Sequence, residues 1–91
     1  MGDVRAEIDR IDRALVALIA QRQRYVERAG EMKDTREAVR DEARIAEVLA
    51  KVVVEAERRG LSAAIAEPVW RTLVERSIAH ELEIFNRKRA S

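Results

Sequence analysis

An arginine occupies a position in the N-terminal hydrophobic pattern where an apolar side chain is expected. Arg22 completes a seam with alternating spacings of four and three residues, formed by Val4, Ile8, Ile11, Leu15, Leu18, Tyr25, Ala29 and Met32. Lys33 lies eleven positions after Arg22, which places it about 20° from Arg22 around a helix axis and about 16 Å along it. Two long basic side chains on one helix face can hold a small anion between them.

Further polar residues interrupt the apolar stripes of the later helices. Ser77 and Glu81 are four residues apart and share one face of a predicted third helix, while Arg44 opens a predicted second helix. Each polar residue also has an ordinary structural interpretation. Arg22 could set the register of a helix pair, Lys33 could complement a helix C-terminus, and Glu81 could form a salt bridge. Singly, none of these residues indicates a site.

Three helices of long, short and medium length are expected to position these residues, in an all-α single domain of residues 1–91. The first, from about residue 3 to 33, would be about 45 Å long, so we expect it to extend beyond its own subunit and pair with a second copy. Residues 34–40 read as a polar loop. Asp41 is the predicted N-cap of the second helix, and Gly60 is its predicted stop.

The third helix has two candidate starts in the sequence. Ser62 is a plausible N-cap, with Ile65 and Val69 among the residues on the apolar side of the helix. Pro68 suits only the first turn of a helix. The sequence therefore predicts either a kink at Pro68 or a start near Glu67.

Arg5 constrains how such a site is assembled. It lies 28 positions before Lys33, or about 42 Å along a helix, and cannot share a small ligand with Lys33 of its own chain. In an antiparallel pair of long helices, Arg5 of the partner subunit lies near Arg22 and Lys33. Two equivalent sites related by a two-fold axis are the expected result.

Composition narrows the function classes. The 18 basic and 17 acidic residues give a net charge of +1, which does not favour nucleic-acid binding. No stretch resembles a membrane span or a signal peptide, so a cytoplasmic location without membrane association is expected. The sequence has no Cys and one His, so we expect no disulfide, no thiolate chemistry and no metal site.

Three segments, "VRAEIDRIDRALVALIAQRQRYVERAGEMK", "AVRDEARIAEVL" and "LVERSIAHELEIF", resemble the all-α chorismate mutase family, which includes the related isochorismate pyruvate-lyases. The resemblance covers about residues 4 to 85. It implies an intertwined homodimer that converts chorismate to prephenate by a 3,3-sigmatropic (Claisen) rearrangement, without cofactor, metal or covalent intermediate. Isochorismate pyruvate-lyase activity and a non-catalytic helical dimerisation module are the alternatives.

The resemblance also implies roles for an ordered set at family spacing: Arg5, Arg22, Lys33, Asp41, Arg44, Ser77 and Glu81. Arg5 of the partner subunit, Arg22 and Arg44 would hold the two substrate carboxylates. Lys33 and Glu81 would hydrogen-bond the ether oxygen of the breaking bond, and the two remaining members would make accessory substrate contacts. Lys33, Glu81 and Arg22 are the predicted catalytic residues.

Two departures from the family pattern bear on the activity. Many members have Gln at the position of Glu81, and a glutamate there must be protonated to donate, so we expect activity to fall as pH rises past neutrality. Ile45 replaces a Glu that commonly binds the chorismate hydroxyl, and the segment from Lys33 to Arg44 looks one residue shorter than in bifunctional bacterial mutases. These last two features resemble the lyases, although lyases usually have Gln at position 81. The sequence favours the mutase.

Overall fold

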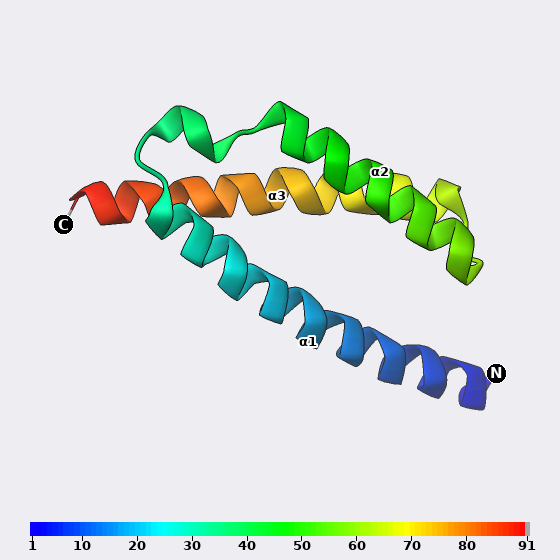
Figure 1. The fold of residues 1–91 in the computed structure, drawn as a ribbon. Helices are drawn as coiled ribbons and strands as arrows, with labels where there is room; N and C mark the ends of the chain where they lie inside the picture. The colour runs from blue at the N-terminus through cyan, green and yellow to red at the C-terminus, as the bar shows by residue number, and fades with distance from the viewer. Residues whose placement is uncertain (91) are drawn as a thin grey trace.

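The part of the chain that the computed structural model describes, residues 1–90, is all-helical and contains no strand. Its elements are α1 (Gly2–Met32), a short 3-10 helix η1 (Arg36–Val39), α2 (Glu42–Arg59) and α3 (Ala63–Ala90). Figure 1 shows α2 lying along α3, while α1 crosses α3 near its own C-terminal end and then diverges from the other helices. The predicted all-α class and the three helices are confirmed.

The long first helix ends where the sequence predicted. Lys33 is its C-cap, with an extended backbone (φ −72°, ψ 140°) that turns the chain towards η1. The side chains of residues 1–21 are all exposed, and burial begins only at Arg22. The C-terminal third of α1 therefore packs within the chain, whereas its N-terminal two thirds extend away from α2 and α3 (Figure 1).

Gly30 allows α1 and α3 to approach closely. It is buried, and a Cβ on it would lie 2.9 Å from the backbone oxygen of Glu81 and 3.2 Å from the Cγ of Glu81. Real Cβ atoms essentially never come that close to a backbone oxygen. This crossing sets the position of Glu81, and a larger residue at 30 would push α3 away.

Gly30→Ala is therefore expected to destabilise the protein. The overpacking cost is about 1–3 kcal/mol, which exceeds the gain of up to about 1 kcal/mol in helix propensity. Urea unfolding monitored by circular dichroism measures the net change. Gly2→Ala is the matched control, because nothing lies within 4 Å of a Cβ added there. A Gly30→Ala protein as stable as the wild type would contradict the close approach.

The helix ends of α2 and α3 follow the predicted capping residues. The Asp41 side chain accepts from the Arg44 backbone N–H at 3.1 Å, and Gly60 adopts the left-handed conformation (φ 75°) at the end of α2. The Ser62 Oγ accepts from the Ala64 backbone N–H at 3.2 Å. All three predictions are confirmed.

The structure corrects two expectations. Residues 34–40 are not simply a polar loop, because they contain η1, whose N-cap Thr35 accepts from the Ala38 N–H, and because Val39 is only 6% exposed. The alternative start of the third helix near Glu67 is also wrong. α3 begins at Ala63 and includes Pro68, so the missing proline N–H does not delay the start of the helix, and the preceding serine caps its first turn.

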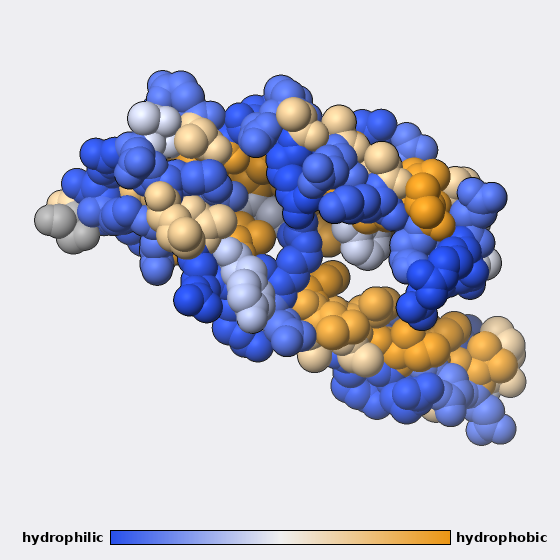
Figure 2. All heavy atoms as spheres, viewed as in Figure 1, coloured by the Kyte–Doolittle hydropathy of each residue, from blue (hydrophilic) through white to orange (hydrophobic). Residues whose placement is uncertain are grey.

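The core formed within one chain is small. Its buried apolar residues are Val39, Ala56, Ala66, Val74 and Phe85. Ile65 and Val69, expected on the apolar side of the third helix, are 57% and 51% exposed. The α1 seam is equally open, at 47–61% exposure for Val4, Ile8, Ile11, Leu15 and Leu18. Figure 2 shows hydrophobic surface along the edge of α1 that faces α2 and α3. Within residues 1–90 of one chain, this wide apolar surface has no cover.

Candidate active site

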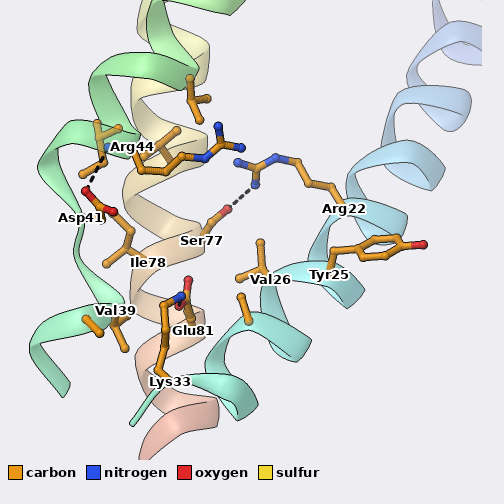
Figure 3. Close-up of a pocket in the computed structure, with 15 residues that line it drawn as sticks. Arg22, Tyr25, Val26, Lys33, Val39, Asp41, Arg44, Ser77, Ile78 and Glu81 are labelled. Carbon is orange, nitrogen blue, oxygen red and sulfur yellow. Dashed lines mark hydrogen bonds and ion pairs between the residues drawn. The ribbon is translucent and has the colours of Figure 1, made fainter. Parts of the chain in front are cut away.

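A cavity of about 360 Å³ lies where α1, η1, α2 and α3 converge (Figure 3). It brings together all but one of the predicted site residues, namely Arg22, Lys33, Asp41, Arg44, Ile45, Ser77 and Glu81. The exception is Arg5, which belongs to the exposed first turns of α1 and does not line the cavity. One chain therefore gathers residues from three helices that are far apart in sequence.

Two guanidinium groups occupy one end of the cavity. The Arg22 Nη1 donates to the Ser77 Oγ at 2.6 Å, and Figure 3 shows the Arg22 and Arg44 side chains reaching towards each other from α1 and α2. Burial, followed by repulsion from Arg44, lowers the pKa of the Arg22 guanidinium. Within residues 1–90, no carboxylate pairs with Arg22. This end of the cavity is therefore suited to a carboxylate from outside the chain.

An ion pair forms the other end. The Lys33 Nζ lies 2.7 Å from the Glu81 Oε2, and Glu81 is only 8% exposed. The C-cap position of Lys33 and the Gly30 crossing together bring these side chains into contact. Glu81 is thus the partner that keeps the Lys33 ammonium inside the cavity.

Asp41 acts locally in this structure. Its carboxylate caps α2 by accepting from the Arg44 N–H and thereby fixes the first turn, which carries Arg44 and Ile45 into the cavity. The Arg44 guanidinium is also paired with Glu47 on the next turn. A direct contact between Asp41 and a substrate stays a prediction.

An apolar wall joins the two polar ends, and the sequence analysis missed most of it. Besides Ile45, its members include Val39, Val48, Val74 and Ile78. Ile45 and Val48 are three residues apart on α2, a spacing that indicated only a packing face. The sequence indicated the place of Val39 in the cavity wall only by its being an apolar residue in a polar segment. An apolar wall between an arginine end and a lysine–glutamate end suits an unsaturated ring that bears a carboxylate.

The comparisons with known proteins agree with this geometry. Residues 4–82 match the family model described as chorismate mutase type II. The chain belongs to the type II chorismate mutase family. It is also similar to the isochorismate pyruvate lyase of Pseudomonas aeruginosa (strain PAO1), at 29% identity over 91 residues, which is the whole of this chain and 90% of that protein. The resemblance inferred from the sequence is confirmed.

Membership of the type II chorismate mutase family places the chain in a group of enzymes that includes both mutases and isochorismate pyruvate lyases. Within residues 1–90, no three His, Asp or Glu side chains come together in a way that could hold a metal ion. Among the helices of the same residues, none combines the length and the apolar character needed to cross a bilayer.

A second, smaller cavity adjoins the site on the side of α1 and α3. Its volume is about 210 Å³, and it shares Arg22, Val26 and Ser77 with the larger cavity. Ile19 and Leu73 provide apolar surface there. No pattern in the sequence predicts this cavity, because it arises from the crossing of α1 and α3.

One further contact joins α1 to α3 beside this second cavity. The His80 Nε2 lies 2.6 Å from the Glu27 Oε2. The hydrogen bond with His80 is the main cause of the lowered pKa of the Glu27 carboxyl. No pattern in the sequence pairs these two residues, which are 53 positions apart.

Proposed function

We propose that this protein is a chorismate mutase. The observation that carries the proposal is the polarity of the main cavity, with the Arg22 and Arg44 guanidiniums at one end and the Lys33 ammonium at the other. Chorismate is a dicarboxylate whose ether oxygen lies between its ring and its enolpyruvyl arm. The arginine end matches a carboxylate, and the lysine end matches an oxygen that gains negative charge.

The rearrangement needs orientation and charge stabilisation rather than a nucleophile. One C–O bond breaks while one C–C bond forms, and no proton is transferred. Arginine forks that bind carboxylates hold the flexible arm over the ring in a compact conformation. As the C–O bond lengthens, negative charge gathers on the ether oxygen, where Lys33 acts as a preorganised donor.

Glu81 must change its partner or its protonation state when substrate binds. As a carboxylate 2.7 Å from Lys33, it competes with the ether oxygen for the ammonium. As a neutral acid it donates a second hydrogen bond to the same oxygen. The proposal therefore includes protonation of Glu81 in the reactive complex.

Glu81→Gln is expected to flatten the pH profile. For the wild type, kcat/KM should fall by about tenfold or more from pH 5 to pH 8, because one hydrogen-bond donor is lost. The glutamine variant keeps a donor at every pH and should vary by less than about twofold. Steady-state assays across this range measure both profiles. Glu83→Gln, an exposed site on the same helix, is the control. Parallel pH profiles for wild type and Glu81→Gln would contradict the role of Glu81 as a hydrogen-bond donor in the reaction.

The proposal includes a homodimer in which α1 of the partner subunit completes the site. The exposed seam of α1 and the exposed Ile65 and Val69 of α3 offer apolar surface that a second α1 would cover. If Arg5 of the partner subunit lies opposite Arg22, antiparallel pairing sets Ile8 of the partner subunit opposite Ile19. Ile19 lines the second cavity, so the first turns of the partner helix would fill that cavity and deliver their arginine to the first.

Mixing two inactive variants tests this arrangement. Arg5→Ala and Arg22→Ala homodimers should each be nearly inactive, because every site lacks one arginine. Random subunit exchange makes half of the dimers mixed, and each mixed dimer regains one of two sites. About a quarter of the wild-type activity is therefore expected after exchange. Activity that stays at the level of the separate variants would contradict a site shared between subunits.

Isochorismate pyruvate-lyase activity is the second candidate. Two observations favour it, namely the similarity to the Pseudomonas aeruginosa lyase over the whole chain and the apolar Ile45 on the cavity wall. Cleavage of isochorismate to salicylate and pyruvate breaks the same kind of C–O bond, so the arginines and Lys33 would serve it equally. The absence of a polar group at Ile45 removes one contact expected for the chorismate hydroxyl.

The direct test supplies purified protein with chorismate and quantifies prephenate. Prephenate formation well above the spontaneous rate supports the mutase. A helical module without turnover is tested by urea unfolding with and without a bicyclic dicarboxylate that mimics the transition state, because a ligand of the native state raises the free energy of unfolding. If the protein shows no turnover and the bicyclic dicarboxylate does not stabilise it, only the dimerisation module remains.

A further inference from the structure

The segment between α1 and α2 carries part of the cavity wall. It begins at Lys33 and supplies Val39 and Asp41, and the first turn of α2 directly after it supplies Arg44. Its only buried side chain among the described residues is Val39. The position of this segment relative to α3 therefore decides how far Arg44 lies from the arginine on α1.

Arg40 joins this segment to two helices at once. Its Nη1 and Nη2 donate to the two carboxylate oxygens of Glu75 on α3 at 3.0 and 2.9 Å. Its Nε donates to Glu42 in the first turn of α2 at 2.7 Å. A bidentate arginine–carboxylate pair fixes direction as well as distance. The hydrogen bonds from Arg40 are the main cause of the lowered pKa of Glu75, so Glu75 stays ionised near neutrality.

An opposing force acts on the same turn of α2. Arg44 lies two residues after Glu42 and faces Arg22 across the cavity (Figure 3). Repulsion between these guanidiniums contributes to the lowered pKa of Arg22. Repulsion between these like charges pushes the start of α2 away from α1 and is reduced by the pairing of Arg44 with Glu47. The bridge made by Arg40 is the polar contact that ties the start of α2 to α3 against this push.

We propose that Arg40 is a positioning residue, whose bridge from Glu75 to Glu42 sets the spacing of Arg22 and Arg44 before a dicarboxylate binds. The inference rests on the proposed function in one respect, namely that the substrate is a dianion. Arg40 does not line the cavity and acts through Arg44. Its effect falls on the binding of substrate, since Lys33 and Glu81 at the reacting end do not depend on it.

Paired variants separate this role from a simple charge effect. Removing the positive Arg40 would weaken, and removing the negative Glu75 would strengthen, the attraction of the protein for a dianion. The bridge instead predicts the same direction for both. Arg40→Ala and Glu75→Ala should each raise KM by about fivefold, the scale of one well-formed exposed ion-pair network. The double variant should be no worse than either single variant.

In Arg40→Ala and Glu75→Ala we expect kcat to change by less than about twofold, because Lys33 stays in place. Arg71→Ala is the matched control, since it breaks an exposed Arg71–Glu67 pair that lies within α3 and joins no other element. Its KM should equal that of the wild type. Opposite shifts for Arg40→Ala and Glu75→Ala, additive effects, unchanged KM values or a loss confined to kcat would each overturn the proposal.

Hydrogen exchange of the ligand-free protein keeps this test independent of the proposed function. Backbone amides of residues 38–44 should exchange faster in Arg40→Ala and Glu75→Ala than in wild type and in Arg71→Ala, because the bridge no longer holds the turn. If no variant turns over chorismate or isochorismate, the proposed function fails while this comparison still decides the bridge. Unchanged exchange in both variants would overturn it.

Discussion

Lys33→Ala is expected to lower kcat for prephenate formation by about 10²–10³-fold, the usual loss when one donor to a developing oxyanion is removed. Among the cavity-lining residues, Lys33 is the only lysine, and it lies at the end opposite the two arginines. Its ammonium points into the cavity and is held by Glu81 at 2.7 Å. Within residues 1–90, no other cation lines that end, so nothing there replaces it.

The variant has a second effect that needs separating. Without Lys33, the buried Glu81 carboxylate loses its partner and would repel a dianionic substrate, which raises KM. Lys33→Ala combined with Glu81→Gln removes this repulsion and leaves the missing donor. We expect KM to recover in the double variant while kcat stays low. Lys51→Ala, on the exposed side of α2, controls for the loss of one positive charge. A double variant with wild-type kcat would contradict the assigned role of Lys33.

Arg22→Ala is expected to lower kcat/KM by about 10²–10³-fold, because it truncates one partner of a desolvated charge pair with the substrate. The ligand-free protein should lose little stability. Removing Arg22 leaves the Ser77 hydroxyl without its 2.6 Å donor but also ends the repulsion with Arg44. Chemical unfolding should therefore shift only slightly, within about 1 kcal/mol.

The same variant distinguishes a ligand-binding arginine from a register device in a helix pair. A register device would change the oligomeric state when replaced, whereas a carboxylate-binding residue would change turnover alone. Light scattering of Arg22→Ala and of Arg28→Ala, an exposed position on the same helix, makes the comparison. Loss of the dimer in Arg22→Ala with wild-type kcat/KM at equal dimer concentration would contradict the proposed role.

The helices were predictable from the sequence because the signals that define their ends are local. Asp41 and Gly60 act on backbone groups within one turn, and so did the serine that starts α3. Gly30 was not interpretable in this way. The structural role of Gly30 depends on α3 passing within van der Waals distance. The hydrophobic periodicity of the sequence does not show such an approach. The buried Val39 of η1 was missed for the same reason.

The candidate site was predictable as a set of residues but not as a set of contacts. The family resemblance named Arg22, Lys33 and Glu81, and the structure places them around one cavity. The hydrogen bond from Arg22 to Ser77 and the ion pair of Lys33 with Glu81 join α1 to α3 across about fifty residues. Such pairings depend on the crossing of the helices. Arg40 was assigned to a polar loop because its two acidic partners lie on other elements.

Competition between the two candidate substrates measures which of them the protein prefers. The purified protein receives an equimolar mixture of chorismate and isochorismate, and the early rates of prephenate and of salicylate plus pyruvate formation give the ratio of the two kcat/KM values. We expect prephenate to dominate and the rates of formation of both products to fall by about 10²–10³-fold in Lys33→Ala. Salicylate and pyruvate with little prephenate would contradict the proposed mutase and make the apolar Ile45 wall the feature that selects the substrate.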